Sequence, residues 1–309
     1  MRTFLCLLLC SLALSGAPPR NPLRVLRVSF WTDARAADAP PLTVKDLTAK
    51  LGPNQARVVS LRGPQDGLVI LLVLDLASDP TAAEAAKQAV GESLKQLPAN
   101  CYVALLKAQD GLRSLVDPTP DRQQIESAIT PLPVSGKAGL LNTLETAMRI
   151  ADTMMDKSGV RVAVFYVTDS SIYNYQEDYT NPVINSSDYR DMSRMFPEGL
   201  IKDKISKLAT IMSALSPPLF VVHLSYQSDR LNEAYQSGLM SLAAESGGAS
   251  AFCRSTAEIP GSINKIMRTI AASYTAEIEL PHNPPKSVQL VLEGEARLSY
   301  RTRFALKEK

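Results

Sequence analysis

The strongest constraint on the fold is an alternation of two patterns between residues 67 and 274. Short apolar runs of β-type composition alternate there with longer segments of helical periodicity, as in a parallel sheet wrapped by helices. The predicted strands are residues 68–74, 102–107, 112–116, 160–167, 219–224 and 249–253. The predicted helices are residues 81–97, 121–129, 141–155, 200–215, 231–245 and 259–274. The alternation predicts an α/β, Rossmann-like fold with a doubly wound, mostly parallel sheet of six strands.

Two of the predicted strands can be placed further. The first run is apolar at every position, which is typical of a central parallel strand whose two faces are both covered. The third run follows an Asp110-Gly111 pair, and Asp-Gly is a hairpin turn signal. We therefore expect the third strand to be antiparallel.

The segments on either side of this region have the alternating pattern of half-buried strands. These predicted strands are residues 23–31 and 57–61 on one side, and 275–280, 287–292 and 297–306 on the other. Prolines punctuate them. We expect residues 18–66 and the tail, residues 275–309, to pair as a small β-rich subdomain beside a central domain, residues 67–274.

The first seventeen residues have the three-part pattern of a secretory signal peptide. Arg2 precedes an apolar stretch over residues 4–14, and the small residues Ser15, Gly16 and Ala17 follow it. The alternative is an uncleaved anchor, but the stretch is shorter than the roughly 20 residues that span a bilayer. We expect cleavage and export to the periplasm or the cell exterior, and no later run reaches transmembrane length.

Charge and histidine content exclude several classes of function. Lys and Arg total 33 against 31 Asp and Glu, so no basic excess favours nucleic-acid binding. Only two histidines are present, which argues against histidine zinc sites and Ser-His catalysis. His223 lies in an apolar run and is interpreted as a core residue. Cys101 and Cys253 also lie in apolar runs, and we expect two buried free thiols rather than a disulfide.

Two aspartates end predicted parallel strands, where ligands bind in doubly wound sheets. Asp75 ends the first strand and Asp169 ends the fourth, both beside hydroxyl residues. One interpretation is an oxygen-rich pocket for a hard divalent cation such as Mg²⁺ or Mn²⁺. The other is that both aspartates cap helices or turns. Spacing alone leaves both open.

With the strand alternation, these positions resemble the von Willebrand factor type A domain, and the layout resembles exported bacterial proteins of this family, best known from acidobacteria. In the family, a metal-ion-dependent adhesion site has an Asp-x-Ser-x-Ser motif, a Thr before a middle helix and an Asp after the fourth strand. The matching positions are Asp75, Ala77, Asp79, Asn142 or Thr143, and Asp169. Ala77 offers no oxygen, so the motif is degenerate.

The resemblance implies noncovalent binding of a protein partner and no enzymatic activity. A long irregular stretch, residues 170–197, is expected at the same edge of the sheet. It carries candidate partner-binding tyrosines, a class of residue enriched at interfaces, although it could equally be a plain surface loop. These are Tyr173, Tyr175, Tyr179 and Tyr189. The alternatives are a metal-dependent phosphoryl hydrolase that uses Asp75, Asp79 and Asp169, and a structural envelope protein with a vestigial site.

Overall fold

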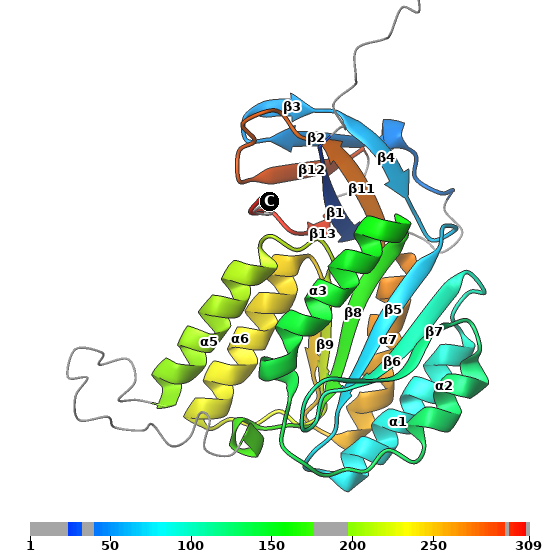
Figure 1. The fold of residues 1–309 in the computed structure, drawn as a ribbon, viewed down its shortest axis with the longest axis vertical. Coiled ribbons are helices and arrows are strands. Elements are labelled where there is room, and N and C mark those ends of the chain that lie inside the picture. The colour runs from blue at the N-terminus through cyan, green and yellow to red at the C-terminus, as the bar shows by residue number, and fades with distance from the viewer. Residues whose placement is uncertain (1–23, 33–39, 176–196, 294–296, 307–309) are drawn as a thin grey trace, which may run out of the picture.

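A computed structural model describes residues 24–32, 40–175, 197–293 and 297–306 (Figure 1). The predicted signal peptide lies outside these residues. The helices are α1 (Pro80–Lys95), α2 (Arg122–Ile129), α3 (Leu140–Ser158), α5 (Pro197–Met212), α6 (Arg230–Ser246) and α7 (Ile259–Ala272), with short 3-10 turns η1 (Val44–Asp46), η2 (Ile172–Tyr175) and η4 (Thr256–Glu258). None of the described helices is both long and apolar enough to cross a bilayer.

The central sheet has six strands in the order β10-β9-β8-β5-β6-β7. They are β5 (Leu68–Asp75), β6 (Cys101–Lys107), β7 (Arg113–Thr119), β8 (Arg161–Thr168), β9 (Leu219–His223) and β10 (Ser250–Phe252). All neighbours are parallel except β6 and β7, which are antiparallel. The predicted fold class is therefore confirmed, and the third strand of this sheet is antiparallel as expected. From β5 the chain continues to β6 and β7 on one side, and then returns to β8, β9 and β10 on the other side. The order therefore reverses between β5 and β8, and doubly wound folds bind ligands at the carboxyl ends of the strands at such a point.

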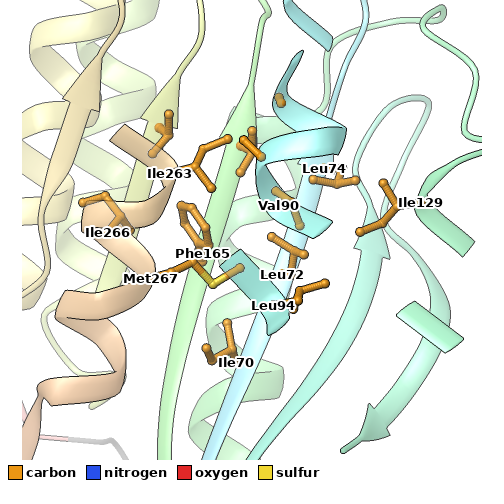
Figure 2. Close-up of a cluster of buried hydrophobic side chains, with 14 of the residues drawn as sticks. Ile70, Leu72, Leu74, Val90, Leu94, Ile129, Phe165, Ile263, Ile266 and Met267 are labelled. Atoms are coloured by element: carbon orange, nitrogen blue, oxygen red, sulfur yellow. The ribbon is translucent and has the colours of Figure 1, made fainter. Parts of the chain in front are cut away.

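Helices cover both faces of the central sheet and bury an apolar layer on each. On one face, α1, α2 and α7 pack against alternate strand residues such as Ile70, Leu72 and Phe165 (Figure 2). On the other face, α3, α5 and α6 pack against the intervening residues, such as Leu71 and Val73. This two-sided burial explains why β5 and β8 are almost continuously apolar. Cys101 and Cys253 are buried and free, as predicted.

Two smaller antiparallel sheets lie at the opposite end of the molecule from α1 (Figure 1). One has the order β13-β1-β11-β4 and the other β12-β2-β3. Their strands are β1 (Val25–Trp31), β2 (Leu47–Leu51), β3 (Asn54–Ala56), β4 (Val58–Arg62), β11 (Tyr274–Glu279), β12 (Val288–Leu292) and β13 (Ser299–Tyr300). In each sheet, strands that precede the central region pair with strands that follow it. A third apolar cluster fills the space around these sheets.

The hairpin of β2 and β3 was not predicted. The Gly52-Pro53 pair forms the turn that joins these two paired strands. Gly52 has a positive φ of 57°, which glycine adopts at little cost. The alternation of buried Leu47, Ala49 and Leu51 with exposed residues carried the missed signal.

Candidate functional site

Asp75 is the last residue of β5 and its side chain is completely buried. Its carboxylate accepts hydrogen bonds from the backbone N–H groups of Gly139 at 2.9 Å and Leu140 at 3.2 Å, at the start of α3. The Thr168 hydroxyl donates a third bond at 3.1 Å. Burial raises the pKa of the Asp75 carboxyl to about 6, although these hydrogen bonds act in the opposite direction. Asp75 thus joins the end of one strand to the N-terminus of a helix.

Asp169 follows β8 directly and is 1% exposed. Its Oδ1 accepts from the backbone N–H of Ala77 at 2.7 Å, and its Oδ2 accepts from those of Ser78 at 3.0 Å and Asp79 at 2.7 Å. The Ser78 hydroxyl also donates to the Asp169 carbonyl oxygen at 2.9 Å. Asp169 therefore holds the loop between β5 and α1 against the end of β8.

The third predicted carboxylate, Asp79, is the N-cap of α1. Its Oδ1 accepts from the backbone N–H groups of Thr81 at 2.9 Å and Ala82 at 3.0 Å. Pro80 occupies the first helical position, where its missing N–H costs nothing. The carboxylate of Asp79 thus caps the N-terminus of its own helix.

The predicted threonine and asparagine ligands have other roles. Thr143 is buried, and its hydroxyl donates to the Gly139 carbonyl oxygen at 2.8 Å while lying 3.0 Å from the Tyr166 hydroxyl. Asn142 is exposed on the first turn of α3.

A divalent cation of the family type does not fit this donor set. Ala77 has no side-chain oxygen, and Asp75 and Asp169 already bind backbone N–H groups with both of their carboxylate oxygens. Within the described residues, no group of three or more His, Cys, Asp or Glu side chains could hold a metal ion. We derive no chemistry through a metal here.

The predicted partner-binding tyrosines divide into three cases. Tyr173 on η2 is 50% exposed, and its hydroxyl donates to the Asp229 carboxylate at 3.0 Å. Tyr175 is completely buried: its hydroxyl accepts from the Leu141 N–H at 3.0 Å. We correct the prediction for Tyr175, because a side chain in the core between η2, α3 and α6 cannot reach a partner. Tyr179 and Tyr189 lie outside the described residues.

Sequence reasoning missed two exposed side chains at the same edge of the sheet. Tyr226 follows β9 and is 38% exposed, and Arg254 follows β10 with its guanidinium 5.5 Å from the centroid of the Tyr226 ring. The sequence contained the information to find them, because ligands bind at the carboxyl ends of parallel strands and both residues follow such strands, as Asp75 and Asp169 do. His223 itself is buried as predicted, and burial lowers its pKa to about 4, so the ring is neutral at neutral pH.

Comparisons with known proteins identify the central region. Residues 72–171 match the family model of the von Willebrand factor type A domain. No curated protein sequence matches the chain.

Solved structures of several proteins align with this chain at low identity. A von Willebrand factor type A protein from Catenulispora acidiphila aligns over 90% of this chain and 76% of its own, with 11% identity and a TM-score of 0.49. The pilus adhesin SpaC from Lactobacillus rhamnosus GG aligns over 74% of this chain and 35% of its own, with 14% identity and a TM-score of 0.48. The PilB minor pilin from Streptococcus sanguinis aligns over 67% of this chain, with 11% identity and a TM-score of 0.47, and this chain spans 62% of the pilin. The segment that is similar to the von Willebrand factor type A domain, residues 72–171, contains both Asp75 and Asp169.

Proposed function

We propose that this chain is an exported, non-enzymatic protein-interaction module that binds its partner through the loops at the carboxyl ends of β8, β9 and β10. The observation that carries the proposal is the group formed by Tyr173, Tyr226 and Arg254. These exposed side chains follow three neighbouring strands of the central sheet, and the first of these strands, β8, lies in the segment that matches the von Willebrand factor type A family. Tyr and Arg are among the residues that contribute most to binding at protein interfaces.

The side chains of this group are already held in place. The Tyr173 hydroxyl donates to Asp229, which is the N-cap of α6, and the Arg254 guanidinium lies over the Tyr226 ring. Because both tyrosines have a fixed contact, they lose less conformational entropy when a partner covers them. The arrangement therefore supports a preformed binding surface.

A hydrolase gains no support from the same edge of the sheet. Asp75, Asp79 and Asp169 each accept hydrogen bonds from backbone N–H groups, and they do not assemble into a common metal-binding cluster among the described residues. We therefore propose that the adhesion site is degenerate and that binding uses the surrounding side chains. A panel of phosphate esters, assayed with Mg²⁺ and with chelator, tests this: metal-dependent hydrolysis would contradict it.

Site-specific photo-crosslinking tests the binding surface. A photoreactive amino acid is placed at position 173 or 226, and at position 240 as the control. Met240 lies on α6 and is 53% exposed, so it is as accessible as Tyr173. We expect discrete protein adducts from positions 173 and 226 in the host cell and none from position 240. Equal adducts at all three positions, or none at any, would contradict the proposal and favour a structural role.

Affinity measurements follow once the crosslinked partner is known. We expect Tyr173→Ala combined with Tyr226→Ala to weaken binding at least about tenfold, as loss of interface aromatic residues commonly does. Met240→Ala is expected to leave the affinity unchanged.

The proposal of export rests on the sequence of residues 1–17, which lie outside the described residues. N-terminal sequencing of the protein purified from its host tests it. We expect the first residue to be Pro18, and an intact Met1 in the cell interior would contradict export.

A further inference from the structure

The degenerate adhesion site has a hydrogen-bonding arrangement that suggests a role of its own. In the family, oxygen ligands at these positions surround a cation. Here the same two aspartates are surrounded by backbone N–H groups. Asp75 accepts two of them and Asp169 accepts three. All five donors belong to segments that lead into α1 or α3.

Asp169 has the stronger arrangement of the two. Its three backbone bonds are 2.7, 3.0 and 2.7 Å long and use both carboxylate oxygens. Backbone N–H groups and the N-terminus of a helix carry partial positive charge, which attracts a carboxylate. The charge that a cation would neutralise is therefore compensated by the backbone.

Ala77 is part of this arrangement rather than only a lost ligand. Its backbone N–H donates to Oδ1 of Asp169 at 2.7 Å, although its side chain has no oxygen to offer a cation. On the other side, Asp75 holds Gly139, where a side chain would overlap with the Ala108 carbonyl oxygen. Both aspartates thus accept backbone N–H bonds with each of their carboxylate oxygens.

We propose that Asp75 and Asp169 form a metal-independent clasp that fastens the N-termini of α1 and α3 to the ends of β5 and β8. The clasp takes the structural place of the cation, and the protein folds to the same stability with and without divalent metal. This inference is independent of the proposed partner binding.

Thermal unfolding of the full chain in chelator, in millimolar Mg²⁺ and in millimolar Mn²⁺ tests the clasp. We expect the same Tm in all three conditions. Asp169→Asn is expected to lower the Tm by about 5 °C or more, and by the same amount in each condition, because one oxygen cannot accept three bonds. Asp121→Asn is the matched control: Asp121 is the N-cap of α2, accepts from two backbone N–H groups, and lies outside the clasp. Its loss of Tm is expected to be smaller.

Two outcomes of the unfolding experiment would overturn the clasp. One is a rise in Tm with Mg²⁺ or Mn²⁺ that Asp169→Asn abolishes, since this would show a bound cation. The other is an Asp169→Asn variant with unchanged Tm in chelator. Calorimetric titration of the unmodified protein with each metal gives a direct readout: no heat is expected, and stoichiometric binding would overturn the inference.

Discussion

The two ends of the central sheet bury charges of opposite sign, and backbone groups form hydrogen bonds with those charges at both ends. At the carboxyl end, Asp75 and Asp169 accept N–H bonds at the N-termini of helices. At the amino end, Arg161 and Arg301 are 1% and 2% exposed and donate to carbonyl oxygens at the C-termini of helices. Each charge thus faces the helix end whose dipole stabilises it.

The amino end differs in what it joins. Arg161 begins β8 and donates to the carbonyl oxygens of Ser273 at 2.7 Å and Ala271 at 3.3 Å, at the C-terminus of α7. Arg301 follows β13 in the flanking sheet and donates to the carbonyl oxygens of Leu215, Met212 and Ser213 at the end of α5. Arg301 therefore fastens a flanking sheet to the central domain, and Arg161 fastens β8 to the end of α7. The acidic end fastens helices to their own sheet.

The two ends also differ in their response to pH. Burial lowers the pKa of Arg161 and of Arg301 to about 10, so both stay charged at physiological pH. Burial raises the pKa of Asp75 to about 6, within the range that a cell compartment can reach. Of these three groups, only Asp75, at the acidic end, titrates near pH 6.

The largest expected effect comes from one glycine at each end. A Cβ at Gly139 would overlap with the carbonyl oxygen of Ala108, and a Cβ at Gly248 would overlap with that of Leu219. Backbone atoms cannot move aside cheaply, so we expect Gly139→Ala and Gly248→Ala each to lower the free energy of unfolding by more than about 4 kcal/mol. Urea unfolding measures this. Gly261→Ala is the control: nothing lies within 4 Å of its added Cβ in α7, and we expect a change of at most about 1 kcal/mol, in the stabilising direction. If only one of the two variants lost stability, the expectation that a glycine is required at both ends of the sheet would be wrong.

The second largest loss of stability is expected at the two buried arginines. Arg161→Met and Arg301→Met each leave two or more buried carbonyl oxygens without a donor, and we expect a loss of about 2–4 kcal/mol in each case. The matched control is Arg230→Met, because the Arg230 side chain is 85% exposed beside Glu198, and its loss should stay within about 0.5 kcal/mol. Urea unfolding at low and high salt separates the cases, since the buried contacts should not depend on ionic strength. Effects equal to that of Arg230→Met would contradict the fastening role.

The pH dependence tests the difference between the ends. The folded pKa of Asp75, about 6, lies above its ordinary value of 3.8, so its stabilising contribution is complete below pH 3.8 and is lost as the pH rises through 6. We expect the unfolding free energy of the native protein, relative to Asp75→Asn, to fall by up to about 3 kcal/mol between pH 4 and pH 7. The difference in unfolding free energy between the native protein and Arg301→Met should not change between pH 4 and pH 7. A flat Asp75→Asn difference, or one that grows with pH, would contradict the assignment.

The smallest expected effect is at the exposed tyrosine. Tyr173→Phe removes one hydrogen bond to Asp229 at the surface, and we expect the free energy of unfolding to change by less than about 0.5 kcal/mol. Thermal unfolding measures it. A larger loss would mean that Tyr173 holds η2 in place, as Tyr175 does from the core, rather than serving as an exposed contact.

Much of the fold could be predicted from local pattern, because apolar periodicity reports directly on which faces are buried. The continuous apolar run of β5 and the Asp110-Gly111 turn before β7 are examples. The N-cap role of Asp79 was also readable, since Asp before Pro at the first helical position is a helix-start signal. The burial of Tyr175 could not be predicted from the sequence, because Tyr173 and Tyr175 have similar neighbouring residues. Only the packing of Tyr175 against α3 and α6 distinguishes it from the exposed Tyr173.

The sequence by itself determined that Asp75 and Asp169 end parallel strands and that the neighbouring loops lie at one edge of the sheet. Only the tertiary structure decided what their carboxylates bind. Their partners are far along the chain, 64 residues away for Gly139 and 92 residues away for Ala77. Contacts over such separations depend on strand order and on how each helix packs against the sheet. A carboxylate at a strand end can therefore become a metal ligand or a helix clasp, and the choice is made by which backbone N–H groups the fold brings within hydrogen-bonding distance.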